Sequence, residues 1–359
     1  MKFPRQVGLL FLVVVFSLSL VSTGLAAEKT STTSSAATSS QVKPGPPKTV
    51  PTKKAKKKRA PTKKKKKKKI SSCQAVSPKP VAQTGEFGPR PSGIANGGSL
   101  QGLVENEIHY LRTGQHLRTG DQISLQVYDL VNKKMLADIN GDTPRNAASL
   151  IKPFVMLAVY DAVARQELPE NHEIEHLLHR MITVSDNPAT NQLVRRLGNG
   201  DTTQGLVAIN ALMFKMGFYQ TRVKELIPDG GKTYLNQTSA NDATLFFRLL
   251  YDQRLINPHY SQKMNDILLK NVHDRIETFK IKQDGVAVAD KTGYVRGLNA
   301  DCGIVYQKTQ NAGQDYVLSI FIENKTRPAD GWGKRKSAVI RYLSDRIYNN
   351  LKNGQNNKS

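Results

Sequence analysis

The residues of this sequence best suited to chemistry are Ser149 and Lys152, within the segment NAASLIKPFV (residues 146–155). Residues three apart on a helix share a face, so the Lys152 amine can hydrogen-bond and deprotonate the Ser149 hydroxyl, a poor nucleophile by itself. A serine in the first turn of a helix also has its own N–H free to face a developing oxyanion. Ser-x-x-Lys alone is weak, because most such pairs are solvated helix surface.

Two further motifs follow in the chain, Ser185-Asp186-Asn187 and Lys291-Thr292-Gly293. Each has a plain structural explanation, because Asn187 before Pro188 suits the start of a helix and Lys-Thr-Gly suits the exit from a strand. The order Ser-x-x-Lys, Ser-Asp-Asn, Lys-Thr-Gly along one chain nevertheless predicts an enzyme that forms an acyl-serine intermediate.

On these three motifs, the sequence from about Leu100 to the C-terminus resembles the class A β-lactamase and penicillin-binding-protein superfamily. The resemblance implies that Lys291 and Thr292 hold a substrate carboxylate. It also implies an oxyanion hole made by the backbone N–H groups of Ser149 and Tyr294.

The resemblance assigns roles to the second motif as well. Ser185 would carry a proton to the leaving nitrogen, Asn187 would bind the substrate amide, and Asp186 would fix the loop. Gly293 is expected to let a substrate backbone approach closely. Arg296 could add a second charge for the substrate carboxylate or could be plain surface.

Deacylation is where the sequence departs from the family. The interval from Ser149 to Ser185 is shorter than in typical class A enzymes, and no clean Glu-x-x-Leu-Asn element is present. In the matching interval, TRVKELIP (residues 221–228), the acidic candidate is Glu225. It is interpreted as the catalytic base that activates the deacylating water, with a surface-loop glutamate as the alternative.

A rival site is the segment His172-Glu173-Ile174-Glu175-His176, which matches the zinc motif H-E-x-x-H and has His179 on the same face. The segment follows Leu168-Pro169-Glu170, so the histidines lie at a helix start, and no third-ligand motif follows. A polar helix face is the preferred interpretation, and the sequence predicts neither a metal nor a cofactor.

The elements that must position these motifs follow from hydrophobic periodicity and turn residues. Together they predict an α+β, β-lactamase-like fold in which an antiparallel sheet is flanked by N- and C-terminal helices and carries an all-helical lobe. Helices are expected from about 100, over 152–165, 173–182, from 187, over 204–216, 241–251, from 258 and over 334–351, and strands over 123–127, 135–139, 286–290, 302–306 and 316–323.

The N-terminal quarter is not built to fold. Residues 1–27 combine Lys2 and Arg5 with an apolar run and a small-residue cleavage site, which predicts a secretory signal peptide. Residues 28–92 are Ser/Thr/Pro-rich and then Lys-rich, which predicts a disordered tail. The hydrolase domain is therefore assigned to residues 93–359.

The basic charge belongs to the tail. The whole chain has a formal net charge of +24, yet residues 86–359 carry only +6 of it. Lys53 to Lys69 is expected to contact an anionic envelope surface or to act as a solvated spacer, and no nucleic-acid partner is expected. Of the two cysteines, Cys302 is expected to be a buried free thiol in a strand, with a disulfide to Cys73 as the alternative.

The sequence thus predicts an exported, monomeric serine hydrolase of the periplasm or cell envelope, which hydrolyses β-lactam amides through an acyl-enzyme. If deacylation is slow, it is instead a D-alanyl-D-alanine peptidase or penicillin-binding wall protein acting on peptidoglycan stem peptides. A non-catalytic wall-binding module is the third alternative.

Overall fold

The computed structural model describes residue 87 and residues 98–307 and 314–356. The predicted signal peptide, the Lys-rich tail, the predicted domain start at residue 93 and Cys73 lie outside these ranges. None of the helices in the described ranges is long and apolar enough to cross a membrane.

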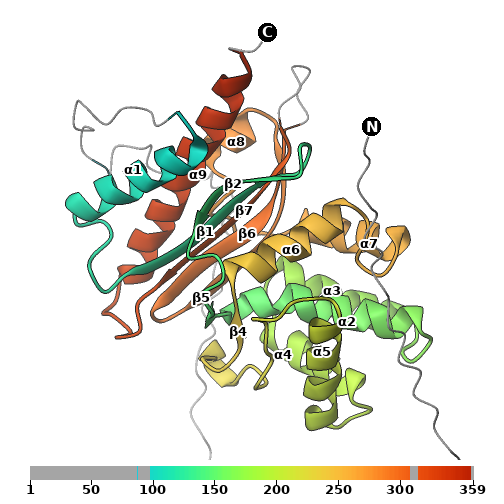
Figure 1. Cartoon of the computed structure of the whole chain (residues 1–359). Coiled ribbons are helices and arrows are strands. Elements are labelled where there is room, and N and C mark those ends of the chain that lie inside the picture. The colour runs from blue at the N-terminus through green and yellow to red at the C-terminus, as the bar shows by residue number, and fades with distance from the viewer. Residues whose placement is uncertain (1–86, 88–97, 308–313, 357–359) are drawn as a thin grey trace, which may run out of the picture. The chain divides into compact units, whose positions relative to one another are not determined.

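Five antiparallel strands form the central sheet, in the order β2-β1-β7-β6-β5 (Figure 1). Apolar residues dominate these strands, and β7 is buried along its whole length because helices cover both faces of the sheet. The strands are β1 Gln122–Asp129, β2 Lys134–Ile139, β5 Ala287–Val295, β6 Leu298–Tyr306 and β7 Tyr316–Glu323, and a second small sheet pairs β3 Arg145–Asn146 with β4 Gln237–Thr238.

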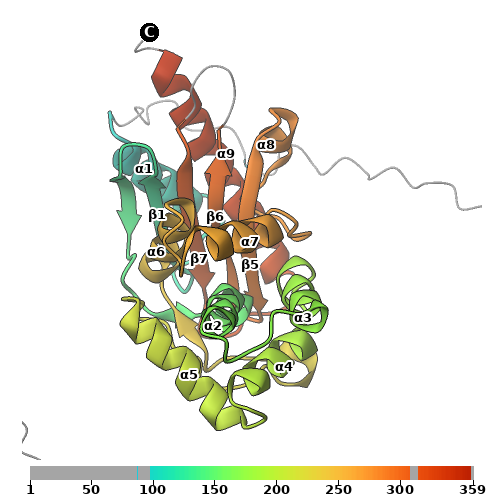
Figure 2. The same cartoon turned by 90° about the vertical axis from the view of Figure 1, so that its right-hand side faces the viewer.

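Two helical layers enclose the sheet (Figures 1 and 2). The helices α1 Leu100–Thr113, α8 Phe279–Gln283 and α9 Trp332–Asn356 share one hydrophobic core with one face of the sheet. On the other face α6 Ala240–Tyr251 packs against the sheet and joins it to a helical lobe. The lobe consists of α2 Lys152–Ala164, α3 His172–Thr183, α4 Asn187–Leu197, α5 Thr202–Lys215 and α7 Pro258–Leu268. The predicted α+β fold is confirmed.

Side chains that cap the backbone set the starts of most helices. The residue before the helix accepts a hydrogen bond from a first-turn N–H, which satisfies a donor that the helix itself leaves unpaired. These caps are Ser99, Asn171, Asp186, Asp201, Ser239 and Asn257, for α1, α3, α4, α5, α6 and α7 respectively.

The third motif lies inside a strand, which corrects the sequence prediction. β5 was expected to end at Asp290, but it continues through Lys291-Thr292-Gly293 to Val295. Pairing with β6, which begins at Leu298 rather than Cys302, holds the motif in the sheet. The plain explanation of Lys-Thr-Gly as the exit from a strand is wrong as well, because continuous cross-strand pairing keeps Gly293 extended. The short helix α8 was not predicted.

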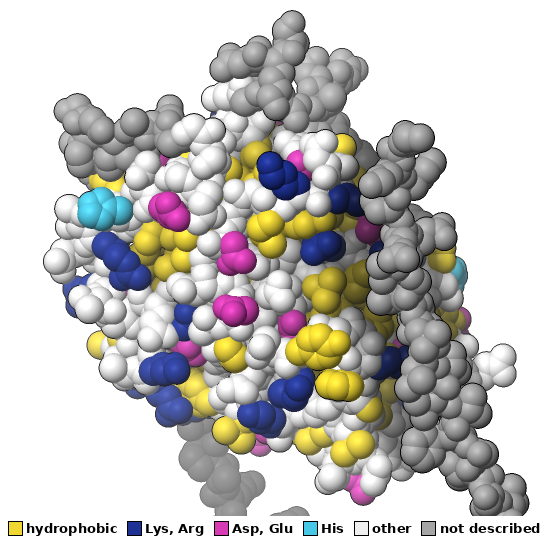
Figure 3. Space-filling view, viewed as in Figure 1, with side chains coloured by type: hydrophobic (Ala, Val, Ile, Leu, Met, Phe, Trp, Pro, Cys, Tyr) yellow, Lys and Arg dark blue, Asp and Glu magenta, His cyan; other side chains and the backbone are white. Residues whose placement is uncertain are grey.

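Cys302 is a fully buried free thiol in β6, as predicted. Burial raises the pKa of this thiol well above its usual value. On the face of the domain seen in Figure 3, Lys and Arg side chains are interspersed with Asp and Glu. This mixture agrees with the small share of the net charge that residues 86–359 carry.

Candidate active site

Ser149 lies on η1 (Ala148–Ile151), a single 3₁₀ turn that leads directly into α2. Ala148, which precedes it, has a left-handed φ of +42°, a conformation that costs a residue with a Cβ of order 1–3 kcal/mol. The turn is held because Asn146 Oδ1 accepts a hydrogen bond from Ala148 N at 2.7 Å and because η1 packs against β4 and β5. The strained turn presents Ser149 at the start of the apolar helix, where the sequence predicts it.

Ser149, Ser185 and Lys152 form one row of hydrogen bonds. Ser185 Oγ donates to Ser149 Oγ at 2.9 Å, and Lys152 Nζ donates to Ser185 Oγ at 3.0 Å. Lys152 Nζ also donates to Ser185 O at 2.5 Å and to Asn187 Oδ1 at 2.8 Å. Within the described contacts no direct hydrogen bond joins Lys152 to Ser149, although their helical spacing predicts one. The loop at Ser185 takes the amine instead, and Ser185 stands between base and nucleophile.

Lys152 is fully buried. Burial, with a smaller contribution from the positive charge of Lys291, lowers the pKa of Lys152 to about 6, against an opposing effect of Asp186. An amine with this pKa is mostly neutral at pH 7, which is the form that a general base needs.

The loop that carries Ser185 is strained and anchored at once. Ser185 has a left-handed φ of +58°. The next residue, Asp186, caps α4 by accepting from Ala189 N at 2.7 Å and forms an ion pair with Arg180. Asp186 therefore fixes the loop that aims Ser185 and Asn187 at Lys152, as expected for a loop-fixing residue.

The Asp186→Ala substitution is expected to lower the free energy of unfolding by about 1 kcal/mol, the usual effect of losing a helix cap. The exposed ion pair adds little. For a domain of this size the melting temperature should fall by roughly 2–4 °C, which calorimetry can measure. Asp201→Ala, which removes the α5 cap, should cause a similar fall but leave the Ser185 loop in place. An unchanged melting temperature for Asp186→Ala would contradict the capping role.

Lys291 is fully buried in β5, and its Nζ donates to Thr292 O at 3.2 Å. Burial lowers its pKa. Beside it, burial and the negative charge of Asp301 raise the pKa of Asp290 well above its usual value. Asp301 accepts hydrogen bonds at 2.9 Å from the backbone N–H of Arg275 and of the residue after it. Both carboxyl groups are buried, and burial raises the pKa of Asp301 as well.

Gly293 has a packing role beside the one expected for it. A Cβ at this position would lie 3.0 Å from Leu150 Cγ and 3.1 Å from Ala147 O. The missing side chain thus lets β5 pack closely against the turn that carries Ser149, and the expected close approach of a substrate backbone stays a prediction. Gly293 positions the nucleophile indirectly.

A cleft of about 520 Å³ opens above Ser149. Of the residues proposed from sequence, five line it: Ser149, Ser185, Asn187, Tyr294 and Arg296. Lys152, Lys291, Thr292, Gly293 and Glu225 are not among its lining residues.

Two cations that the sequence analysis missed also line the cleft, Lys232 and Arg327. The Arg327 guanidinium lies 3.8 Å from the centre of the Tyr234 ring, a cation–π contact across the cleft. Arg296 Nε donates to Pro328 O at 3.1 Å, which ties it to the same loop. In the sequence, Arg327 stands beside Pro328 in the loop between the last strand and the last helix. That pattern alone predicts no function.

Glu225 is engaged by its own loop. Its Oε1 accepts hydrogen bonds from Thr233 Oγ1 at 2.7 Å, Tyr234 N at 2.8 Å and Leu235 N at 3.0 Å. Although partial burial opposes them, these bonds lower its pKa. Its role as a base stays a prediction, and its contacts favour a residue that closes the 225–235 loop.

The rival H-E-x-x-H segment begins α3 at His172, as expected, with Asn171 as the cap. The rings of His172 and His176 stack 6.1 Å apart, and Glu173 pairs with Arg196. Over residues 98–307 and 314–353, no group of three His, Cys, Asp or Glu side chains is arranged to hold a metal ion. The segment is a polar helix face.

The sequence profile of a beta-lactamase enzyme family matches residues 106–171 and 165–351. None of the curated protein sequences matches the chain.

Solved structures share the fold at low identity. A β-lactamase from Sphaerobacter thermophilus is 21% identical, with a TM-score of 0.57 over 69% of this chain and 97% of that one. PBP-A is 21% identical, with a TM-score of 0.58 over 71% and 97%. The chromosome-encoded β-lactamase of Vibrio parahaemolyticus is 17% identical, with a TM-score of 0.58 over 69% and 99%.

Proposed function

The chain belongs to the beta-lactamase enzyme family, and we propose that it is a serine hydrolase that β-lactams and peptidoglycan stem peptides acylate at Ser149. The observation that carries this proposal is the row Ser149 Oγ, Ser185 Oγ, Lys152 Nζ at the cleft, with hydrogen bonds of 2.9 and 3.0 Å. Such a row joins a nucleophile to a buried amine that is mostly neutral at pH 7.

The proton moves along this row when Ser149 attacks. A charged Lys152 has three N–H donors for its three acceptors, but a neutral amine has two. Those two stay with Ser185 O and Asn187 Oδ1, so the lone pair faces Ser185 Oγ. The Ser185 hydroxyl then donates to Lys152 and accepts from Ser149. The Ser149 proton thereby reaches the amine as the Oγ–carbon bond forms, and Ser185 later returns a proton to the leaving nitrogen.

Substrate recognition relies on charge. Lys232, Arg296 and Arg327 give the cleft a positive lining that suits the carboxylate of a β-lactam or of a terminal D-alanine. The resemblance assigns a further carboxylate contact to Lys291 and Thr292, which are buried in β5 and do not line the cleft. The backbone N–H groups of Ser149 and Tyr294 are assigned to the developing oxyanion.

The cleft favours a penicillin-binding enzyme or D-alanyl-D-alanine peptidase with slow deacylation over an efficient β-lactamase. No Asp or Glu occurs among the described residues that line it, and the acidic candidate from the sequence, Glu225, has its Oε1 held by three donors of its own loop. A single-site variant of PBP-A, 22% identical with a TM-score of 0.57, was solved as an acyl-enzyme complex with penicillin G, which supports this outcome.

The test is covalent labelling by a fluorescent penicillin, followed by mass spectrometry of the labelled peptide. The label is expected on the peptide that contains Ser149. A folded protein that takes no label at micromolar penicillin would favour a non-catalytic wall-binding module. Labelling lost with EDTA and restored by zinc would favour the His172 and His176 site instead.

The rate of acylation is expected to rise with pH through about 6, as Lys152 loses its proton. It should fall again at alkaline pH, below the ordinary lysine value of about 10.4, as Lys291 loses the charge that holds the carboxylate. Labelling rates from pH 4.5 to 10 measure both limbs. Asp186→Asn keeps a capping side chain but removes a charge that raises the Lys152 pKa, so it should move the acid limb to lower pH. An acid limb above pH 8 would refute the neutral-amine mechanism.

The predicted export and the basic tail make a separate proposal. Lys53 to Lys69 holds thirteen basic residues among seventeen, and we infer that it tethers the enzyme to an anionic envelope surface. The mature chain should bind anionic vesicles at low salt and leave them near 1 M salt, where the screening length falls to about 3 Å. A chain that begins at Gly93 should not bind. Equal binding by both would rule the tether out.

A further inference from the structure

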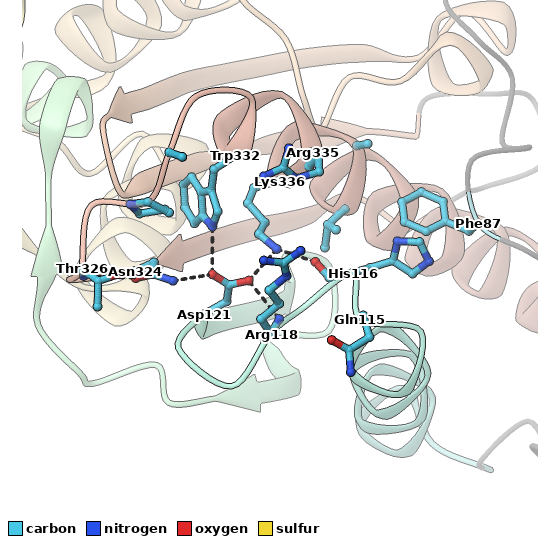
Figure 4. Close-up of a pocket in the computed structure, with 14 residues that line it drawn as sticks. Phe87, Gln115, His116, Arg118, Asp121, Asn324, Thr326, Trp332, Arg335 and Lys336 are labelled. Carbon is cyan, nitrogen blue, oxygen red and sulfur yellow. Dashed lines mark hydrogen bonds and ion pairs between the residues drawn. The ribbon is translucent and has the colours of Figure 1, made fainter.

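A second pocket, of about 530 Å³, lies between the α1–β1 connection, the β7–α9 loop and the first turns of α9 (Figure 4). It shares no lining residue with the cleft above Ser149. Its volume falls in the range of about 300–1,000 Å³ that is typical of small-molecule sites.

Asp121 lies at the centre of a network of hydrogen bonds that holds the wall of the pocket together, as Figure 4 shows. Its Oδ1 accepts from Asn324 Nδ2 and Trp332 Nε1, both at 2.9 Å. Its Oδ2 accepts from Arg118 N at 3.0 Å and pairs with Lys336 Nζ at 2.5 Å. Both oxygens of this buried carboxylate are therefore fully used. The network ties three separate segments of the chain into a preformed wall.

The remaining charge on the pocket is positive. Arg118, Arg335 and Lys336 line it, and Asp121 is the one acidic group among its described lining residues. In the described parts of the chain, neither Arg118 nor Arg335 has a hydrogen bond or ion pair for its guanidinium group. Burial and, to a smaller degree, the charges of both arginines lower the pKa of Lys336. The positive charges of Arg118, Arg335 and Lys336 thus lie close together, and the single carboxylate of Asp121 does not neutralise all three.

Aromatic groups supply the rest of the wall. The Phe87 and His116 rings meet edge to face, with centroids 4.7 Å apart, and the Trp332 ring is held by its bond to Asp121. Apolar side chains with a few polar groups are the usual lining of an organic ligand site.

We propose that this pocket binds a small organic anion, an aromatic carboxylate whose charged group meets the guanidinium groups of Arg118 and Arg335. Its ring would lie among Phe87, His116 and Trp332. Guanidinium groups suit a carboxylate because they offer paired N–H donors in one plane. The site is separate from the acylation chemistry, and binding there does not require Ser149.

The test uses the fluorescence of Trp332, which is the single tryptophan of the chain and lines this pocket. Titration of the full mature chain with benzoate should give a saturable change in emission. Arg118→Gln and Arg335→Gln keep polar side chains of similar reach but remove the charge, and each should weaken the apparent affinity at least about tenfold, the effect of losing one charged hydrogen bond.

Two matched arginines serve as controls. Arg254→Gln, on the exposed α6–α7 connection, and Arg195→Gln, exposed on α4, lie away from the pocket and should leave the titration unchanged. Benzyl alcohol, a neutral analogue, should give no saturable change, and inorganic phosphate should bind more weakly than benzoate because it has no ring. Equal responses to benzoate and benzyl alcohol, or unchanged affinity in both pocket variants, would overturn the proposal.

Discussion

Ser149→Ala is expected to abolish covalent labelling by penicillin, because it removes the hydroxyl at the end of the row that leads to Lys152. Ser185 also has a hydroxyl, but its Oγ is held between Ser149 and Lys152 and its backbone is strained. Gel fluorescence after saturating exposure measures the loss. A label that persists on Ser149→Ala would place the nucleophile elsewhere.

Substitutions of Lys152 and of Ser185 are expected to slow labelling to different extents. Lys152→Met keeps an unbranched side chain in the buried site and removes the amine, so labelling should slow by about a thousandfold, within the usual range for a general base. Ser185→Ala should slow it by roughly a hundredfold, because the proton then has no hydroxyl to cross. Circular dichroism must show both variants folded. If Ser185→Ala labelled at the wild-type rate, proton transfer would not pass through Ser185.

The order and type of most elements could be predicted from the sequence, because caps and periodicity are local signals. Ser239 before α6 and Asn257-Pro258 before α7 each mark a helix start that the structure contains. The ends of β5 and β6 could not be predicted, because the extension through Gly293 depends on pairing between the strands. That pairing is a tertiary property and leaves no mark in either strand alone.

The residues of the site likewise divide into those that could be predicted from the sequence and those that could not. Ser149, Ser185, Asn187 and Lys152 were found from motif spacing, and the structure brings all four within one hydrogen-bond network. The relay through Ser185 was not predicted, since helical spacing describes one helix and Ser185 lies on another segment. Arg327 was missed for a related reason, because the fold carries a distant loop to the cleft.

Persistence of the acyl-enzyme is the second large effect expected. Sequence reasoning assigned Glu225 to the deacylating water, which predicts that Glu225→Gln slows product release at least about a hundredfold. The contacts of Glu225 predict instead that this variant releases product at close to the wild-type rate. Three donors of its own loop hold Oε1, and a pKa below the usual glutamate value makes it a weak base.

Wild-type protein labelled with penicillin and freed of excess ligand should therefore keep its label far longer than labelling takes, and Glu225→Gln should release it within about twofold of the wild-type rate. The same variant should lower the melting temperature, because a neutral amide is a poorer acceptor than a carboxylate for three donors. Thr233→Val, which removes one of those donors, should destabilise the loop in the same way without changing release. Rapid nitrocefin turnover by the wild type that is lost in Glu225→Gln would contradict this expectation. It would identify Glu225 as the base and the enzyme as a β-lactamase, because a carboxylate that only closes a loop cannot account for both results.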